Sequence, residues 1–484
     1  MEATESVGNR SIVAPRVVET HTAIVFFVGD RVYKLKKAVD LGFLDHRTRE
    51  ARWQACQDEV ILNSRLAPDV YLGVLDISGP DGRPLDHMVA MRRMPDDRRL
   101  SRCVERAENL DPTLRSIAHS VATLHAGSVP RPHHDGNARV GAVRQRWVDG
   151  FNQLTRLTGS VPAPERLDRI EELVRCYLDG RAPLFEARIA QGWIRDGHGD
   201  LQAEDIFVLS DGPRILDCIE FGDDYRWGDV LADVAFLAMD LERLGRRDLA
   251  DRFLDLHREL TADRWPMSLA HHYVAYRAHI RAKVVSLRHI QREEAVGTEV
   301  DRLVDLSLAH LEQGRVRLVL VGGLPGTGKS TLAEAIGDRM GAVVLRTDDV
   351  RKRLDRSADR YSLAAVGAVY AELLAEADRL LGLGESVVLD ATWADPAHRD
   401  LARAVARRTS SVRCELRCTL QRDEAGERIR RRRRIGEDPS EATPAVADAM
   451  ASRFASWPEA HDVSTAAAPE LVAQGAISVV LDNG

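Results

Sequence analysis

The stretch Gly323-Leu324-Pro325-Gly326-Thr327-Gly328-Lys329-Ser330 decides the fold of the C-terminal part of this chain. It matches the pattern G-x-x-x-x-G-K-[ST] at every position. An apolar run at 318–321 precedes it, and the helix-like sequence STLAEAIGDRM begins at its last residue. A strand, a glycine-rich turn and a helix in this order form a loop that binds phosphate groups. Because the strand is apolar throughout, the sequence predicts an α/β domain built on a parallel sheet.

Each residue type in this loop has a chemical reason to be there. Glycines let backbone N–H groups turn inward around an anion, and the helix N-terminus adds a partial positive charge. The lysine is expected to reach the β- and γ-phosphates, and Ser330 to bind Mg²⁺. We therefore expect ATP and Mg²⁺ as cofactors. The residues expected to bind the nucleotide are Gly323, Gly326, Thr327, Gly328, Lys329, Ser330 and Thr331.

Two acidic residues downstream suggest phosphoryl transfer. The predicted strand AVVLRTDDVRKRL carries Thr347-Asp348, with Arg351 three residues later, and the strand in ESVVLDATWADPAHR ends at Asp390. Open α/β sheets bind ligands at the C-terminal ends of their strands. We expect Asp348 to accept a proton from the attacking hydroxyl and help to hold Mg²⁺, Arg351 to steady the acceptor, and Asp390 to lie near the metal. Helix capping is the competing role for each carboxylate.

An arginine-rich segment, ERIRRRRRIGEDPSEAT, follows, with six arginines between Arg428 and Arg434. A solvated helix face is one interpretation, and nucleic-acid binding is disfavoured because no aromatic residues are interleaved. We favour a lid whose arginines stabilise the transferring phosphoryl group. Arg428 and Arg432, one helical turn apart, are the candidates.

With the loop, the T-D-x-x-R sequence at 347–351 and this lid, the region resembles the small P-loop kinases. That group includes gluconate kinase, polynucleotide kinase and the zeta-toxin group. The resemblance implies phosphorylation of a hydroxyl on a small molecule or a nucleic-acid end.

The chain divides at about residue 313, where helical spacing in 301–313 ends at Gly314. Residues 314–484 form the predicted P-loop domain. For residues 1–313 the sequence predicts a small β-rich lobe of about 1–95, joined to a helical lobe of about 96–313. The segment TAIVFFVGDRVYKLKK (22–37) predicts a β-hairpin that turns at Gly29-Asp30.

The helical lobe contains a second motif, His198-Gly199-Asp200-Leu201-Gln202-Ala203-Glu204-Asp205, followed by ILDCIEFGDDYRWGDVLADVAF. Protein-kinase-like enzymes use H-x-D-x-x-x-x-N and then an acidic metal ligand. Asp200 occupies the position of the base, and His198 is expected to brace the loop. Asp205 stands at the asparagine position, and Glu220 or Asp217 supplies the acidic metal ligand.

Asp229 and Asp233 open the apolar helix that follows. We expect this pair to cap the helix and to anchor the catalytic loop.

Lysine is scarce in this chain, since only six of the 68 basic residues are lysine and three of them fall at 34–37. A retained lysine suggests a need for a compact ammonium group. Lys34 on a strand and Glu59 on a helix are expected to form the ion pair that orients ATP phosphates. Lys36 points to the same face by strand alternation and is the alternative.

These motifs resemble the aminoglycoside phosphotransferase family, a kinase-like fold. The order of both parts, with RVYKLKK, HGDL, DCIEF and YRAHIRAK, resembles bacterial fused proteins that join such a domain to a C-terminal P-loop kinase domain. The implied fold is an α+β bilobal protein-kinase-like domain followed by an α/β P-loop domain with a parallel sheet. The resemblance does not imply antibiotic substrates.

The composition excludes several classes of protein. A net charge of −7 disfavours a nucleic-acid or membrane-coating role, and no apolar stretch approaches the ~20 residues of a membrane span. Scattered cysteines are typical of reduced thiols in a cytoplasmic protein. We therefore expect an ATP-dependent kinase with two nucleotide sites and a small-molecule acceptor. A regulatory nucleotide-binding protein with a weak N-terminal kinase domain, or a polynucleotide-end kinase, is the alternative. The sequence does not give the oligomeric state.

Overall fold

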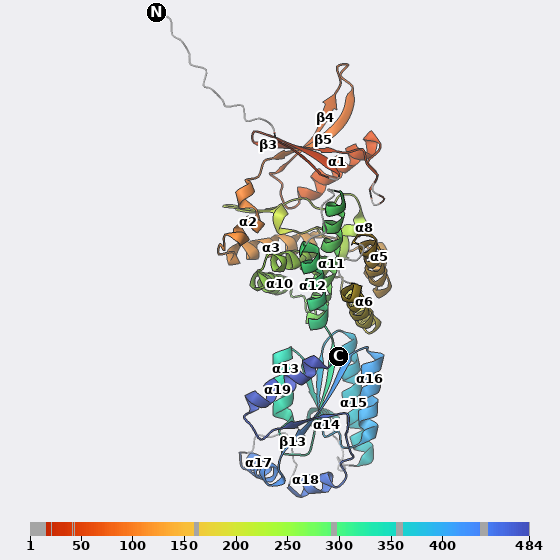
Figure 1. The fold of residues 1–484 in the computed structure, drawn as a ribbon, viewed down its shortest axis with the longest axis vertical. Helices are drawn as coiled ribbons and strands as arrows, with labels where there is room; N and C mark the ends of the chain where they lie inside the picture. The colour runs from red at the N-terminus through yellow and green to blue at the C-terminus, as the bar shows by residue number, and fades with distance from the viewer. Residues whose placement is uncertain are drawn as a thin grey trace, which may run out of the picture. The chain divides into compact units, whose positions relative to one another are not determined.

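The computed structural model describes residues 16–20, 22–40, 42, 44–158, 164–291, 298–354, 362–435 and 444–483. The chain forms two compact units, neither of which is continuous in sequence (Figure 1). The first comprises Met1–Ala138 and Arg188–Arg264, and the second Arg139–Ala187 and Trp265–Gly484.

The first unit contains a five-stranded antiparallel sheet in the order β1-β2-β3-β5-β4. Its strands are β1 (Arg16–Glu19), β2 (Ala23–Val28), β3 (Arg31–Lys36), β4 (Tyr71–Ser78) and β5 (Pro84–Arg92). The predicted hairpin is confirmed, because β2 and β3 pair antiparallel on either side of Gly29-Asp30. Gly29 takes a φ of 57°, the left-handed conformation that glycine adopts at low cost.

Helix α1 (Arg49–Asn63) covers this sheet. Thr48 caps its N-terminus by accepting a hydrogen bond from Ala51 N–H at 3.1 Å. Buried residues recur with helical spacing on one face of α1, and Glu59 is among them. An ionisable side chain is therefore carried into the interior, where it needs charged partners.

The rest of the first unit is mainly helical, with two short two-stranded ribbons. Its helices are α2 (Leu100–Glu105), α3 (Asp111–Gly127), α4 (Asp135–Ala138), α8 (Asp223–Arg226), α9 (Val230–Arg243) and α10 (Arg247–Thr261). Short 3-10 turns are η1 (Asp96–Arg98), η2 (Pro132–His134) and η3 (Ala203–Asp205). The ribbons pair β6 (Ile194–Asp196) with β9 (Trp227–Asp229), and β7 (Ile206–Leu209) with β8 (Gly212–Ile215). A β-rich part and a helical part match the predicted bilobal arrangement.

The second unit is built on the predicted parallel sheet, in the order β11-β12-β10-β13-β14. Its strands are β10 (Arg317–Gly322), β11 (Val343–Arg346), β12 (Val387–Asp390), β13 (Val412–Thr419) and β14 (His461–Ser464). Every residue of β10 is buried, which explains its unbroken apolar run. Its helices are α13 (Lys329–Met340), α14 (Thr347–Leu354), α15 (Leu363–Gly382), α16 (Pro396–Arg408), α17 (Arg422–Ile435), α18 (Pro444–Ala451) and α19 (Pro469–Asp482).

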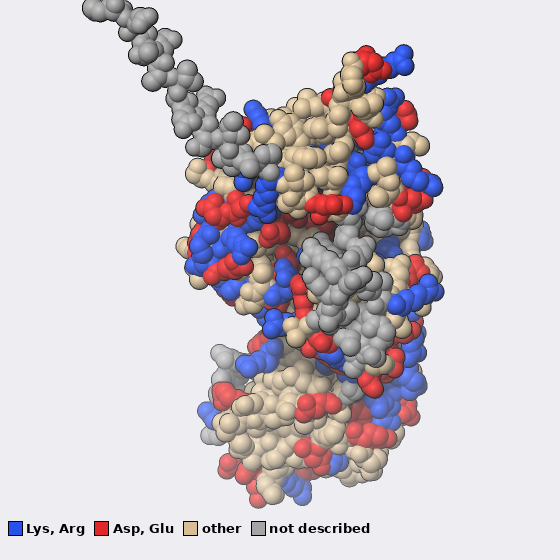
Figure 2. All heavy atoms as spheres, turned by 45° about the horizontal axis from the view of Figure 1, so that its top comes forward, with Lys and Arg blue, Asp and Glu red and all other residues tan. Residues whose placement is uncertain are grey.

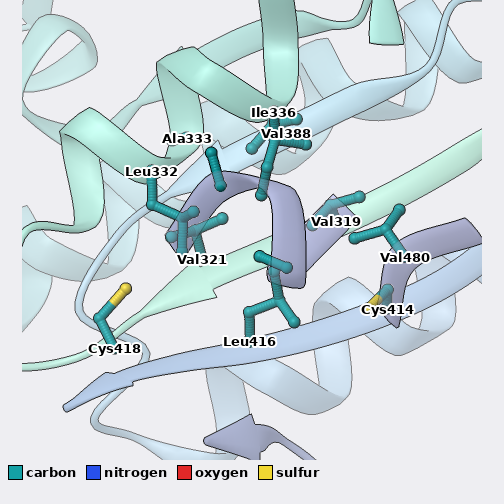
Figure 3. Close-up of a cluster of buried hydrophobic side chains, with 12 residues drawn as sticks. Val319, Val321, Leu332, Ala333, Ile336, Val388, Cys414, Leu416, Cys418 and Val480 are labelled. Carbon is teal, nitrogen blue, oxygen red and sulfur yellow. The ribbon is translucent and has the colours of Figure 1, made fainter. Parts of the chain in front are cut away.

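Helices cover both faces of this sheet, α13 and α19 on one and α15 and α16 on the other (Figure 1). Side chains of α13 and α19 pack against those of β10, β12 and β13 in a cluster of buried hydrophobic residues (Figure 3). This core fixes the start of α13 against the end of β10, where the glycine-rich loop lies.

Helices from before the predicted boundary belong to the second unit. They are α5 (Val140–Thr158), α6 (Pro164–Asp179), the first part of α7 (Ala182–Ala190), α11 (Met267–Gln291) and α12 (Thr298–Gln313). The buried Arg181 donates to Thr409 O at 2.6 Å, and Ser268 Oγ donates to Gly384 O at 2.7 Å. The sequence-based boundary after residue 313 stays a prediction. These two contacts also show that helices preceding residue 313 pack against the P-loop domain.

The molecular surface fits the modest net charge. On the face of the first unit visible in Figure 2, basic and acidic side chains are interspersed. Within the part of the chain that the structure describes, no helix has the length and apolar character needed to cross a membrane.

A buried histidine should make the second unit sensitive to acid. Trp147 Nε1 donates to His272 Nε2 at 3.3 Å, and burial lowers the pKa of His272 to about 3. The unfolded state takes up this proton near pH 6.5 and the folded state does not, so stability falls as the pH falls below 6.5. We expect a loss of about 2 kcal/mol between pH 7 and pH 5 from this residue. His272→Phe, which keeps the ring stacked on Tyr177, should remove that part of the pH dependence of urea unfolding. An identical pH dependence in both proteins would contradict this.

Candidate functional site

The glycine-rich loop lies between the end of β10 and the start of α13. Gly323, Gly326 and Gly328 have φ values of 134°, 83° and 84°, which residues with a Cβ rarely adopt. A Cβ at Gly323 would lie 2.6 Å from Cys418 O, and one at Gly326 would lie 2.6 Å from Ala425 O. These positions therefore require glycine for space as well as for conformation.

The amide of Gly323 is already engaged, because its N–H donates to Thr392 O at 3.2 Å. The inward-facing amides of the loop therefore follow Gly323 in the chain. Thr327 Oγ1 donates to Leu324 O at 2.8 Å, which closes the turn from within. Lys329 Nζ donates to the same carbonyl at 3.0 Å, so the ammonium group lies over the loop.

Ser330 and Asp390 meet at the end of the sheet, as the sequence predicts. Asp390 is the last residue of β12, which runs parallel to β10, and it accepts a hydrogen bond from the Ser330 side chain. Burial raises the pKa of Asp390, while Lys329 and the Ser330 hydroxyl oppose that rise. A hydroxyl, a carboxylate and an ammonium group thus lie together at the first turn of α13.

Asp348 lies in the first turn of α14 and not on a strand, so that detail of the sequence interpretation is wrong. The preceding strand β11 ends at Arg346, and the chain turns directly into a helix at Thr347. Arg351 Nη1 contacts Asp348 Oδ1 at 2.5 Å, so this pair forms as an i,i+3 contact on α14. Thr347 Oγ1 donates to Asp390 O at 3.4 Å, which ties the start of α14 to the end of β12.

Residues 427–435 of the arginine-rich segment lie in α17, and Arg428 faces the loop. Arg428 Nη2 donates to Thr465 O at 2.8 Å, and Thr465 Oγ1 donates to Thr327 O at 2.8 Å. The side chain of Arg432 lies outside the described residues. Thr465, which the sequence analysis missed, follows β14 and carries no motif that would single it out.

Two cavities flank the loop. One of about 350 Å³ is lined by Gly328, Thr331, Leu332, Arg428, Arg431, Thr465, Ala467, Pro469 and Val472. The other, of about 410 Å³, lies against Leu324 and Pro325 and is bounded by α17 and α18. The lining of the first cavity includes the predicted phosphate-binding residues Gly328 and Thr331 together with Arg428 and Arg431 of α17.

In the first unit, the loop around Asp200 is held by buried hydrogen bonds. His198 Nε2 lies 3.0 Å from Leu216 O, and Asp200 N–H donates to His198 Nδ1 at 3.4 Å. Burial lowers the pKa of His198, so the neutral ring serves as a brace between the two segments of the site.

Helix α9 anchors this loop through aspartates, as predicted. Asp229 caps the helix by accepting from Leu231 N–H at 2.9 Å. Asp233 accepts from the N–H groups of His198 and Gly199, each at 2.8 Å, and contacts His125 Nε2 at 2.9 Å. Burial would raise the pKa of Asp233, but these hydrogen bonds hold it below its usual range.

Both candidate lysines contact Glu59, which resolves how they share the site. Lys34 Nζ lies 3.0 Å from Glu59 Oε1 and 2.7 Å from Asp217 Oδ1. Lys36 Nζ lies 2.5 Å from Glu59 Oε2 and also pairs with Glu220. Burial opposes ionisation of Glu59, but the two ammonium groups outweigh it and keep its pKa below the usual value.

The Lys34 and Lys36 ion pairs differ in how exposed their side chains are to solvent. The Lys36 side chain is 1% exposed, whereas that of Lys34 is 17% exposed and its partner Asp217 is 53% exposed. Asp217 has a φ of 65°, which is uncommon outside glycine, and Tyr71 OH accepts its N–H at 3.2 Å. Lys34 and Asp217 are therefore the pair that a ligand can reach.

Asp205 lies close to Asp217 and Asp200. Burial raises the pKa of Asp205 well above its usual range, and the carboxylates of Asp217 and Asp200 add to the rise. Within the described ranges, no three His, Cys, Asp or Glu side chains are close enough together to hold a metal ion by themselves.

Comparisons with known proteins place the chain in a family. The family model described as "AAA domain" matches residues 318–457. The proteins named "Uncharacterized protein Rv2004c" of Mycobacterium tuberculosis (strain H37Rv) and "Uncharacterized protein Mb2027c" of Mycobacterium bovis are each 42% identical over 461 residues. These alignments cover 93% of this chain and 92% of each relative.

The chain is also similar to solved structures over part of its length. The M. tuberculosis APS kinase CysC in complex with AMPPNP and APS is 24% identical, with 34% of this chain and 97% of that chain covered and a TM-score of 0.29. The GDP and kanamycin complex of APH(2'')-IIia is 13% identical, with 62% and 94% covered and a TM-score of 0.39. Because these relatives match over nearly the whole chain, the chain belongs to the family of these mycobacterial proteins, and its residues 318–457 form an AAA domain.

Proposed function

We propose that the protein is an ATP-dependent kinase whose C-terminal domain transfers phosphate to a hydroxyl group of a small molecule. The observation that carries this proposal is the meeting of the glycine-rich loop, Lys329, Ser330 and Asp390 at one end of the parallel sheet. Asp348 and Arg351 lie on α14, which follows β11, the strand next to β12. A carboxylate that can act as an acid–base group therefore lies at the same end of the sheet.

The transfer uses positioning and charge more than covalent chemistry. Loop amides and Lys329 hold the β- and γ-phosphates. Asp348 accepts the proton of the acceptor hydroxyl while the oxygen of that hydroxyl bonds to the γ-phosphorus. The bond between the γ-phosphorus and the β–γ bridging oxygen breaks, and ADP leaves. Arg351 holds the Asp348 carboxylate in place, and Arg428 offers positive charge to the phosphoryl group.

The residues present fit Mg²⁺. In kinase sites this ion takes one or two protein oxygens, with water and phosphate oxygens completing its shell. The Ser330 hydroxyl and the Asp390 carboxylate supply such a pair, with Asp348 nearby as the further candidate. The ion would neutralise charge on the phosphates. A buried carboxylate whose pKa is raised by desolvation also gains from a cation beside it.

The two cavities offer places for the two substrates. The 350 Å³ cavity beside Gly328 and Thr331 has apolar walls from Leu332, Pro469 and Val472 and arginines from α17, which suit a nucleotide base. The 410 Å³ cavity beside Pro325 is lined by Arg422, Asp423, Arg430 and Asp448, which suit a polar acceptor. A small hydroxyl compound is the acceptor class that this lining favours.

Lys329→Ala should lower ATP turnover by about 10²–10³-fold, because a charge that stabilises the transferring group is lost. Turnover should be measured over a panel of sugars, sugar acids and aminoglycosides under saturating Mg-ATP. Lys37→Ala removes an ammonium group from an exposed pair with Glu19 in the other unit and is the matched control. Unchanged turnover in Lys329→Ala would contradict the assignment of the C-terminal site. If Asp348 is the base, Asp348→Asn should lower ATP turnover by about the same factor as Lys329→Ala.

A second candidate function is supported by the ion pairs of the first unit. Lys34 and Lys36 hold Asp217 and Glu220, the two acidic candidates for a metal ligand. The N-terminal domain would then bind nucleotide at Lys34 and act chiefly as a regulatory site. Lys36 would serve as a fixed internal counter-ion.

Two lysine variants test this division in a Lys329→Ala background, where ATP binding reports the N-terminal site. Lys34→Ala should weaken ATP binding at least about tenfold in calorimetry, because it removes an accessible charged contact worth about 1.5–3 kcal/mol. Lys36→Met should instead lower the free energy of unfolding by about 3–5 kcal/mol, because Glu220 loses its ammonium partner and the buried Glu59 keeps only Lys34. Equal effects of the two variants on ATP affinity would contradict the division of roles, and rapid phosphate transfer in this background would contradict a regulatory role.

A further inference from the structure

Two buried tryptophans press against the strand end that precedes the glycine-rich loop. A Cβ at Gly322 would lie 2.2 Å from Trp457 Cζ3 and 3.1 Å from Trp393 Cδ1. The two indole rings therefore touch the backbone one residue before Gly323. Neither tryptophan belongs to the nucleotide-binding motif.

Trp393 is held in a strained conformation. Its φ is 54°, an outlier for a bulky side chain, and its side chain is fully buried. The turn it forms places Thr392 O where it accepts the N–H of Gly323 at 3.2 Å. Tyr370 OH accepts Trp393 N–H at 3.2 Å, and Trp393 Nε1 donates to Leu389 O at 3.4 Å. Strain of this kind persists where the surroundings fix the backbone, and it clusters at functional sites.

Arg399 on α16 holds this turn. It is 2% exposed, and its Nε donates to Trp393 O at 2.6 Å. The other nitrogens donate to Ala394 O at 3.2 Å, Ala455 O at 2.9 Å and Ser456 O at 2.6 Å. Its guanidinium carbon lies 4.7 Å from the centre of the Trp457 ring. One buried cation thus joins the strained turn to the segment that carries the second tryptophan.

Trp457 is fixed from its other side by a buried carboxylate on β13. Trp457 Nε1 donates to Glu415 Oε2 at 2.5 Å, and Arg403 holds both oxygens of Glu415 at 2.9 Å each. Glu415 is paired in register with Leu320 of β10. Trp393, Arg399, Glu415 and Trp457, called here the tryptophan support, therefore surround the end of β10 from the strands and loops on both sides.

We propose that Arg399 is a positioning residue for the phosphate-binding loop, and that the tryptophan support fixes the backbone at Gly322 and Gly323 so that the loop amides face the β- and γ-phosphates before the nucleotide arrives. This inference rests on the proposed nucleotide site and adds residues outside its motif. The support acts through backbone geometry, because Thr392 O sets the direction of the Gly323 peptide. A strained turn and a buried guanidinium are costly features for a core whose only task is stability.

The test compares Arg399→Met with Arg181→Met in the full-length protein. Arg181 is an equally buried arginine of the same unit that donates to the backbone carbonyl of Thr409 and does not contact the loop. Both variants should unfold at lower temperature, so all binding is measured where each is fully folded. Binding of ATP, ADP and AMP is followed by calorimetry, and the C-terminal site is identified by its loss in Lys329→Ala. Amide hydrogen exchange is followed at Gly323.

Arg399→Met should weaken ATP and ADP binding by about ten- to a hundredfold, the effect of losing about one hydrogen bond to a charged phosphate. AMP, which lacks the β- and γ-phosphates, should bind as it does to the wild type. Exchange of the Gly323 amide should become faster, because its bond to Thr392 O opens more often. Trp457→Phe, which keeps an aromatic ring but loses the bond to Glu415, should change both readouts in the same direction and by less. Arg181→Met should change neither.

Wild-type ATP affinity in folded Arg399→Met, an equal loss for AMP, or unchanged exchange at Gly323 would each overturn the proposal. If the proposed function is wrong, the result differs. Lys329→Ala would then bind ATP as the wild-type protein does. In that case the Gly323 exchange rate alone decides whether Arg399 fixes the loop.

Discussion

The close approach of side chains and carbonyls to the C-terminal end of β10 is the constraint on which the second unit depends. Trp457 leaves no room for a side chain at Gly322, and Cys418 O leaves none at Gly323. Glycine is therefore required at both positions by space, and only glycine readily takes the loop's positive φ angles. Once the strand end is fixed, helix α13 starts with Lys329 and Ser330 at a defined point. The parallel register then brings Asp390 of β12 beside them.

The first unit is organised by buried charge. Asp233 accepts hydrogen bonds from two backbone N–H groups of the loop around Asp200 and from His125, and Asp240 accepts another from Ala203 N–H. Glu59 lies between two lysines, each of which has a second carboxylate on the segment 217–220. Buried ions are costly unless each has a partner, so these groups specify one arrangement of sheet, helix and loop. The scarcity of lysine elsewhere in the chain fits this use of two ammonium groups in a confined space.

The two halves use different physical means at the candidate sites. The second unit presents backbone amides and one lysine at a helix start, whereas the first presents carboxylates balanced by ammonium groups. Loop amides offer hydrogen bonds to phosphate without titrating, while the carboxylate cluster gathers negative charge that needs a cation. The second unit also includes helices that precede the predicted boundary, and Arg181 and Ser268 join them to the sheet domain.

The sequence by itself determined the features that depend on neighbouring residues. These are the glycine-rich loop between strand and helix, the hairpin at Gly29-Asp30 and the cap at Asp229. Only the tertiary structure decided the rest. It shows that Asp348 lies in the first turn of a helix and that Arg399 joins two loops. It also shows that Lys36 is buried against Glu220, whereas Lys34 is accessible. Local patterns fix backbone conformation through sterics and short hydrogen bonds, whereas the burial and partners of a charge are set by segments far apart in sequence.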